Sequence, residues 1–352
     1  MTDVYEKLAQ HLDNLPSGFP RTDSGVEMRI LKRLFSPDEA EVAAKLTMMP
    51  EPVAGIAQRT DMDEVELAGM LAEMAKKGLI FRISKGDHLL YSAAQFVVGI
   101  WEYHLNDLDE ELIRDVNEYM PDLMNKSWLK TKTKQMRVVP VAKSVSADMA
   151  VMPFEAAEEI INKQSKIVVA DCICRKEQKM IGKGCDKPME VCLSFGAGAY
   201  YYEQNGLGRE IDKAEALELV KKGVQAGLVL QPGNQQKSLN ICMCCGCCCG
   251  VLKNLKKMDK PALAVHTNYY AEVDAEACIG CEACVERCQV DAITVDEIAA
   301  VDLDRCIGCG LCVTECPTEA MLLKQKDEKN QYVPPKNVFE TYMNIAQERG
   351  LM

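Results

Sequence analysis

All eighteen cysteines of the 352-residue chain lie between Cys172 and Cys316, and eight of them form two runs with one spacing. The spacing is C-x2-C-x2-C-x3-C, and the second run begins 28 residues after the first, from Cys278 to Cys306. Thiolates at this spacing bind 4Fe–4S clusters, and the fourth cysteine of each run binds the cluster of the other run. The sequence therefore predicts one cluster on Cys278, Cys281, Cys284 and Cys316, and a second on Cys306, Cys309, Cys312 and Cys288.

The flanks of the two runs repeat as well, since each run opens with Cys-Ile-Gly-Cys, and this indicates two copies of one structural unit. Residues 272–324 resemble a bacterial-type ferredoxin domain with two 4Fe–4S clusters. One position departs from that pattern: Gln289 follows the fourth cysteine of the first run, where the second run has Pro317. Proline there shapes a turn and supplies no ligand, so we expect both clusters. We also expect Ile279 and Ile307 to cover the clusters and exclude water.

The other ten cysteines fall into two stretches of the chain, one after a predicted strand at 167–173 and one within 242–249. They are Cys172, Cys174, Cys185 and Cys192, followed by Cys242, Cys244, Cys245, Cys247, Cys248 and Cys249. So many thiols without metal would oxidise and cross-link. The sequence therefore predicts one or two additional iron–sulfur clusters here, with a structural zinc site or reduced structural thiols as the alternatives.

Strand alternation predicts how these thiols are arranged. In an extended chain, Cys172 and Cys174 point to the same face. The same alternation across 242–249 gives two sides. Cys242, Cys244 and Cys248 lie on one side, and Cys245, Cys247 and Cys249 lie on the other.

Two wider resemblances bear on this region. Cys244-Cys245-Gly246 resembles the cysteine-rich domains of heterodisulfide-reductase-type proteins over three residues. The whole chain resembles a group of multi-cluster iron–sulfur proteins of anaerobes. Those proteins combine a winged-helix-like segment, a Cys-x-Cys-Arg region, an Asn-x-Cys-x-Cys-Cys-x-Cys-Cys-Cys run and a ferredoxin tail. That resemblance implies no specific reaction.

The elements around the cysteines predict an α+β protein. Helical apolar spacing over 26–77, followed by a hairpin over 79–91 with a turn at Lys85-Gly86-Asp87, is typical of a winged helix. The C-terminal tail could wrap onto a partner subunit, which leaves an oligomer or a larger complex open. We expect five parts: a winged-helix-like domain at 1–104, a helical connector at 105–165, a cysteine-rich α/β domain at 166–265, a two-cluster ferredoxin-like domain with a pseudo-two-fold repeat at 266–324, and a tail with a helix at 325–352.

The net charge of −12 is unevenly placed. Residues 272–324 hold twelve Asp/Glu against three Lys/Arg, a net of −9, and residues 166–260 hold fifteen Lys/Arg against ten Asp/Glu, a net of +5. The acidic part predicts docking to a redox partner with a basic face. The predicted recognition helix at 61–77 is acidic, which argues against DNA as a partner. We interpret one basic run as a solvated face, with binding of an anionic substrate as the alternative: Arg175, Lys176, Lys179, Lys183 and Lys187.

The sequence predicts a cytoplasmic protein without membrane insertion. No apolar run approaches the ~20 residues of a membrane helix, and the acidic, amphipathic N-terminus is unlike a secretion signal. Many thiolates favour the reducing cytoplasm of an anaerobe.

We therefore interpret the chain as an iron–sulfur protein that passes low-potential single electrons between a redox partner and the cysteine-rich region. Two alternatives remain: a reductase or reductase subunit with a catalytic cluster at 172–249, and a redox-sensing transcription regulator. The sequence assigns no catalytic residue and leaves open whether the chain is an enzyme.

Overall fold

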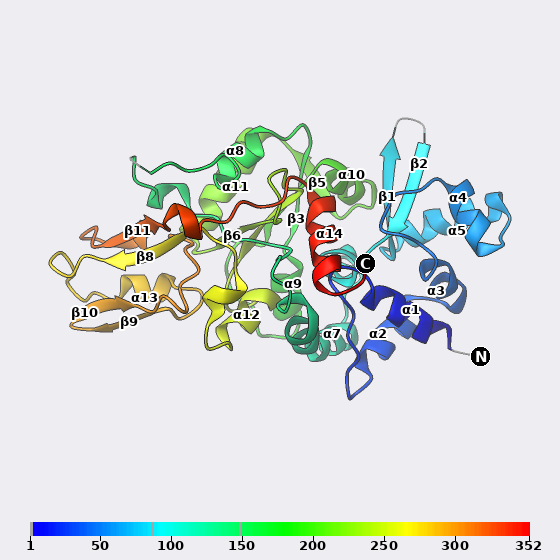
Figure 1. Cartoon of the computed structure of the whole chain (residues 1–352), viewed down its shortest axis with the longest axis horizontal. Helices are drawn as coiled ribbons and strands as arrows, with labels where there is room; N and C mark the ends of the chain where they lie inside the picture. The colour runs from blue at the N-terminus through cyan, green and yellow to red at the C-terminus, as the bar shows by residue number, and fades with distance from the viewer. Residues whose placement is uncertain (1–2, 86–87, 148) are drawn as a thin grey trace. The chain divides into compact units, whose positions relative to one another are not determined.

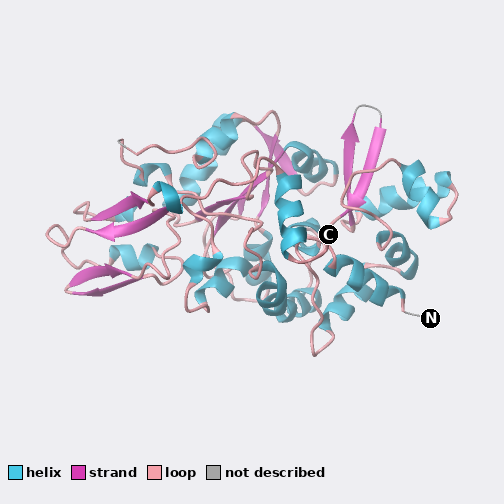
Figure 2. Cartoon of the chain, in the orientation of Figure 1, coloured by secondary structure: helices cyan, strands magenta, loops and turns pink. Residues whose placement is uncertain are grey.

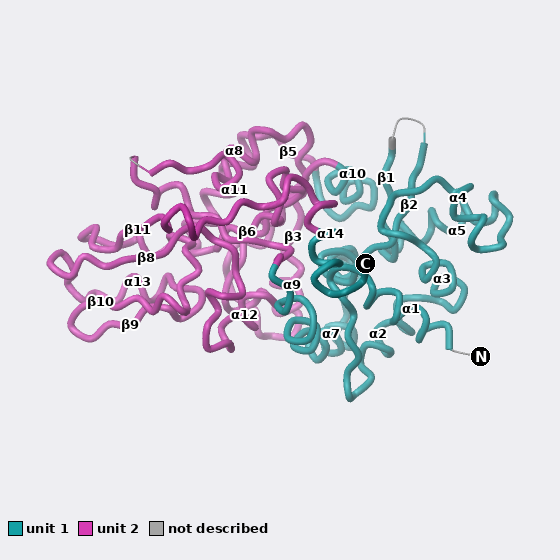
Figure 3. Tube along the Cα trace, viewed as in Figure 1, with its two compact units in different colours: residues 1–132, 197–209, 342–352 teal, residues 133–196, 210–341 magenta. Residues whose placement is uncertain are grey.

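The computed structural model describes residues 3–85, 88–147 and 149–352. The chain forms two compact units (Figure 3), the first made of residues 1–132, 197–209 and 342–352 and the second of residues 133–196 and 210–341. Both units contain helices and strands (Figure 2), which confirms the α+β class. The units combine segments that are distant in sequence, and the five domain ranges stay a prediction.

The first unit begins with five helices and a two-stranded antiparallel sheet (Figure 1). Ser36 and Glu39 form a reciprocal capping box at the start of α3, with Pro37 in the first turn. The predicted hairpin turn includes Gly86 and Asp87, which lie outside the described residues. The assignment as a winged helix stays a prediction. The elements are α1 (Val4–Asp13), α2 (Val26–Leu34), α3 (Pro37–Ala43), α4 (Val53–Thr60), α5 (Glu64–Lys76), β1 (Ile80–Lys85) and β2 (His88–Ala93).

Later segments complete the first unit. After α7 (Glu110–Leu123), the chain returns to this unit with α10 (Gly196–Gln204), and near the C-terminus it returns again from Tyr342 on, within α14 (Val338–Glu348). The hydroxyl of the buried Tyr201 in α10 lies within hydrogen-bonding distance of two carbonyl oxygens near the end of α5 and the start of β1. These contacts fix α10 against the helices and hairpin of the first unit.

The predicted recognition helix, α5, keeps its acidic character at the surface. Asp63 caps its N-terminus, and Glu64, Glu66 and Glu73 are exposed. Carboxylates near the N-terminus stabilise a helix, but they would repel phosphates. The exposed carboxylates of the folded helix therefore still argue against DNA binding.

The second unit contains a five-stranded sheet in the order β5-β3-β4-β7-β6. The pairs β3/β4, β4/β7 and β7/β6 are antiparallel, and Cys192 in β4 lies opposite Cys242 in β7. Helix α11 (Lys213–Gln225) packs against the sheet with α8 (Ala157–Asn162) beside it (Figure 1). The strands are β3 (Ile167–Asp171), β4 (Glu190–Phe195), β5 (Gly208–Ile211), β6 (Val229–Pro232) and β7 (Asn240–Cys244).

The two cysteine runs lie between two small antiparallel sheets of the second unit. β8 (Tyr269–Val273) pairs with β11 (Met321–Gln325), and β9 (Ile293–Asp296) pairs with β10 (Ile298–Val301). Helix α13 (Ala283–Arg287) contains the third cysteine of its run, Cys284, whereas the second run has only a 3-10 turn, η5 (Val313–Glu315), after its third cysteine. Side chains from both sheets and both runs form one hydrophobic core.

Arg305 links these sheets to the rest of the second unit. Its guanidinium donates hydrogen bonds to the carbonyl oxygens of Lys256 and Met258 near α12 (Gly250–Lys256), and to those of Val290 and Asp291. An ion pair of 2.9 Å joins Lys256 to Asp291 in the same contact. Because one planar group bonds four carbonyls from two segments, it fixes the two cysteine runs against α12.

We expect Arg305→Met to lower the free energy of unfolding by about 2 kcal/mol, since hydrogen bonds to a charged donor are lost while much of the side-chain volume is kept. Anaerobic urea titration followed by circular dichroism measures this change. Lys324→Ala is the control, because its ion pair with Glu272 is largely exposed and such pairs contribute little. Equal effects of the two variants would contradict this role of Arg305.

Candidate iron–sulfur and metal-binding sites

Four of the eight predicted ligands line one cavity, which we call the first cluster site: Cys278, Cys281, Cys284 and Cys316. Cys281 is exposed and Cys284 is buried. A cavity lined by four thiols suits a 4Fe–4S cluster in both shape and donor type. The ligation itself stays a prediction.

The other four lie together in what we call the second cluster site: Cys306, Cys309, Cys312 and Cys288. Burial, with a smaller contribution from the neighbouring Cys288 and Cys306, raises the pKa of Cys309 to about 12. Burial also raises the pKa of Cys312. Metal binding must displace these protons, so a cluster would be coupled to proton release.

The two sites differ in how well they are covered. Ile307 is 1% exposed, whereas Ile279 is 66% exposed and lines the cavity of the first site, so the cover of the clusters by these two side chains stays a prediction. A segment from elsewhere in the second unit covers the second site. The backbone N–H of Val141 donates to the carbonyl of Cys309 at 3.1 Å, and Ser144 lies directly against Gly310. The segment 141–144 comes from outside the repeat, so the repeat alone does not indicate this asymmetry.

The repeated Cys-Ile-Gly-Cys has a steric cause. Gly280 and Gly308 have φ values of 66° and 64°, in the left-handed region. A Cβ atom would lie 2.3 Å from the Glu297 carbonyl oxygen in the first copy and 2.2 Å from the Tyr269 carbonyl oxygen in the second. Both the backbone angle and the close approach require glycine.

Hydrogen bonds to sulfur follow the same two-fold relation. The backbone N–H of Ala299 donates to Cys278 Sγ and that of Ala271 donates to Cys306 Sγ, both at 3.4 Å. Each repeat thus supplies one backbone amide to a cysteine sulfur of the other repeat. Such bonds stabilise negative charge on the sulfur and are one way a protein sets a cluster potential.

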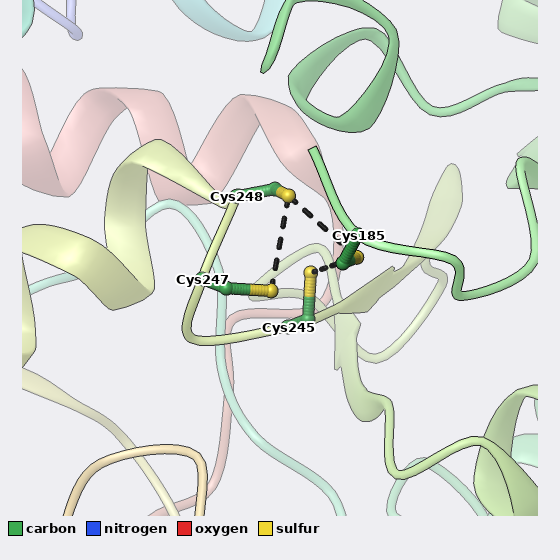
Figure 4. A group of neighbouring side chains, drawn as sticks. All are labelled: Cys185, Cys245, Cys247 and Cys248. Atoms are coloured by element: carbon green, nitrogen blue, oxygen red, sulfur yellow. Dashed lines mark hydrogen bonds between the residues drawn. The ribbon is translucent and has the colours of Figure 1, made fainter. Parts of the chain in front are cut away.

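The remaining ten cysteines divide into two groups in the second unit. The first, which we call the four-cysteine group, has Sγ atoms that all lie within 4.8 Å of one another (Figure 4). Cys185 Sγ is 4.0 Å from Cys245 Sγ and 3.7 Å from Cys248 Sγ, and Cys247 Sγ is 3.8 Å from Cys248 Sγ. The group consists of Cys185, Cys245, Cys247 and Cys248.

The other six form the six-cysteine group, in which each thiol contacts the next. Hydrogen bonds from Cys192 and Cys244 lower the pKa of Cys242. Hydrogen bonds from Cys174 and Cys244 lower the pKa of Cys249 despite its burial. The chain of contacts ends at Cys172, whose thiol bonds Cys174. The members are Cys172, Cys174, Cys192, Cys242, Cys244 and Cys249.

This division corrects the sides predicted for 242–249, whereas Cys172 and Cys174 stay together although they do not lie on one strand. β3 ends at Asp171, and Cys174 belongs to the helix α9 (Ile173–Met180). β7 ends at Cys244, and a turn at 246–248 follows. Alternation stops where a strand stops. Cys248 therefore joins Cys245 and Cys247, while Cys249 joins Cys242 and Cys244.

Arg175 lies between the two groups. It is 1% exposed, so the prediction of a solvated face is wrong for this residue. Its guanidinium donates to Cys245 Sγ at 3.6 Å and to the Met243 carbonyl at 3.0 Å. Burial alone would lower its pKa, but the thiols of Cys172, Cys245 and Cys244 together raise it. A buried, permanently charged group offsets the negative charge of thiolates.

The comparisons agree with this geometry. Residues 271–323 match the family model described as "4Fe-4S dicluster domain". Comparison with curated proteins and with solved structures found no match. The second unit therefore carries a 4Fe–4S dicluster domain, and together with the cysteine-rich groups it indicates iron–sulfur electron transfer. In the part of the chain that the structure describes, no helix has the length and apolar character needed to span a membrane.

Crossed ligation predicts a selective effect of single substitutions. We expect Cys316→Ser to damage the first cluster, whose other predicted ligands are Cys278, Cys281 and Cys284, and to spare the second. Cys288→Ser should do the reverse. Electron paramagnetic resonance of the reduced, anaerobically purified variants separates the two signals. Equal loss of both signals in a variant with unchanged circular dichroism would contradict crossed ligation.

Proposed function

We propose that the chain passes low-potential single electrons between a redox partner and its cysteine-rich groups, by way of the two clusters of the dicluster domain. One contact carries this proposal. The backbone N–H of Gly246 donates to Oε1 of Gln289 at 2.9 Å. Gly246 lies between Cys245 and Cys247, and Gln289 directly follows Cys288 of the second cluster site. One hydrogen bond therefore joins the dicluster domain to the cysteine-rich loop.

The two segments also touch directly. A Cβ atom on Gly246 would lie 2.3 Å from the Gln289 carbonyl oxygen, so only glycine allows the loop to come this close. A proline at 289, as at Pro317, could not accept the hydrogen bond, since it has no side-chain amide. The departure of Gln289 from the ferredoxin pattern thus gains a reason: it connects the second cluster site to the cysteine-rich loop.

The unequal cover of the two cluster sites supports a direction along this route. The first site has an exposed Cys281 and an exposed Ile279, so a partner can approach it. The second site is covered by the segment 141–144 and contacts the cysteine-rich loop through Gln289. We infer that a partner exchanges electrons with the first cluster and that the second cluster exchanges them with the cysteine-rich groups.

Charge around the first cluster site suits a basic partner. Glu282 lines the cavity and is exposed. Glu276, two residues before Cys278, and Glu297, whose carbonyl oxygen lies against Gly280, are also exposed. Complementary charge speeds encounter, and the effect weakens as salt screens it. Negative charge also disfavours adding an electron to the cluster, which supports a low potential. With eighteen free cysteines, we place the protein in a reducing cytoplasm.

Gln289→Pro tests the route with little change to the backbone. Cys288 (φ −74°, ψ 117°) has nearly the conformation of Cys316 (φ −72°, ψ 113°), which already precedes a proline. We expect this variant to keep both dicluster signals and to slow reduction of the cysteine-rich groups at least several-fold. Stopped-flow absorbance after mixing with dithionite measures both phases.

Pro317→Gln is the matched control, because it makes the reverse exchange at the equivalent position of the other run. It should leave the slower phase unchanged. Unchanged transfer in Gln289→Pro and Gln289→Ala alike would refute the proposed route.

The acidic surface is tested with two small reductants of opposite charge. In a Glu282→Lys, Glu297→Lys variant we expect slower reduction by the reduced methyl viologen cation and faster reduction by the dithionite anion. Both changes should shrink as ionic strength rises. A Glu73→Lys, Glu218→Lys variant is the control, because it makes the same change of charge at two other exposed sites. Rates that do not depend on the sign of the reductant would contradict entry at the acidic face.

A further inference from the structure

We propose that the four-cysteine group binds one divalent transition-metal ion, iron or zinc, in a tetrahedral four-thiolate site distinct from any iron–sulfur cluster. The four residues come from two places: Cys185 lies in the connection between α9 and β4, and the other three lie in the turn after β7. The site goes beyond the electron route proposed above and does not depend on it.

The separation of the sulfurs carries the argument. Four thiolates at about 2.3 Å from one ion form a tetrahedron whose edges are about 3.8 Å. The three Sγ–Sγ contacts in this group are 3.7, 3.8 and 4.0 Å, and all four atoms lie within 4.8 Å of one another. These values match a single ion held by all four sulfurs.

A 4Fe–4S cluster needs a wider arrangement, because each thiolate binds a different iron at a different corner of the cluster. The dicluster domain provides the comparison within the same chain. Its first cluster site encloses a cavity. Across residues 3–85, 88–147 and 149–352, the four-cysteine group is the one set of potential ligands gathered within 4.8 Å. The first cluster site thus has a cavity between its thiols, whereas the four thiols of the four-cysteine group leave space for one ion.

The surroundings fit a four-thiolate ion. Four thiolates and a divalent ion leave a net charge of −2, which needs a counter-charge when buried. Arg175 supplies one positive charge by donating to Cys245 Sγ from a buried position. Cys245 and Cys248 are buried, whereas Cys247 is exposed and gives an ion access from solvent.

The ion would fix the loop that contacts the dicluster domain. Cys245 and Cys247 flank Gly246, the donor to Gln289. Binding both neighbours of Gly246 to one ion, together with Cys185, restricts the loop on each side of that contact. A zinc ion would act as a structural link only, and an iron ion could in addition change valence.

The first test is metal and sulfide content of the full chain purified without oxygen. We expect Cys185→Ser and Cys247→Ser each to lose one metal ion per chain and no acid-labile sulfide. Cys174→Ser, in the six-cysteine group, is the matched control and should keep that ion. Loss of several irons together with sulfide in the Cys247→Ser variant would overturn the proposal, as would no loss of metal in either variant.

X-ray absorption of the unaltered protein tests the proposal without a substitution. If the ion is zinc, its edge should report four sulfur neighbours at about 2.3 Å and no iron neighbour. If the ion is iron, Mössbauer spectra should contain one component per chain from isolated tetrahedral iron, separate from cluster iron. Zinc bound by nitrogen or oxygen in place of sulfur, or iron found only in clusters, would refute the site.

Discussion

The structure depends on keeping many reactive thiols in small, separate groups. Thiols that are exposed together without metal oxidise and cross-link. The chain separates them where strands and helices end. β7 stops at Cys244 and the next residues turn, so Cys248 and Cys249 are neighbours in sequence but belong to different groups. Between the groups, the buried guanidinium of Arg175 supplies a fixed positive charge.

The internal repeat builds two similar cluster sites that the rest of the second unit makes different. Gly280 and Gly308 share a left-handed backbone, and each repeat gives a backbone amide to a cysteine sulfur of the other repeat. The cover differs, however: among the described residues, the segment 141–144 contacts Cys309 and Gly310 of the second site, whereas Cys281 of the first site is exposed. Two similar sites with unequal access to solvent suit an electron route in which a partner meets the exposed site and the covered site lies further inside. A symmetric pair of sites would not favour either direction.

The charged side chains of the dicluster domain also differ between the two ends of that route. Exposed carboxylates surround the first cluster site, whereas arginine side chains act at the inner contacts of the dicluster domain. Arg305 bonds the carbonyls near α12, and Arg287 bonds those of Val224 and Gln225 at the end of α11. Both arginines hold the domain in a position where Gln289 meets Gly246.

The sequence by itself determined the dicluster domain, because its ligand spacing, its glycines and its repeat are all local features within 53 matched residues, 271–323. It also determined the α+β class and caps such as Ser36, since these follow from short-range patterns. Only the tertiary structure decided how the ten other cysteines divide, why Ile279 is exposed and why Arg175 is buried. Those outcomes depend on contacts between distant segments, such as Cys185 with Cys245, 60 residues apart, and Arg175 with Cys245, 70 residues apart. No periodicity within one segment encodes a contact of that kind, because the contact depends on where the sheet brings two separate turns.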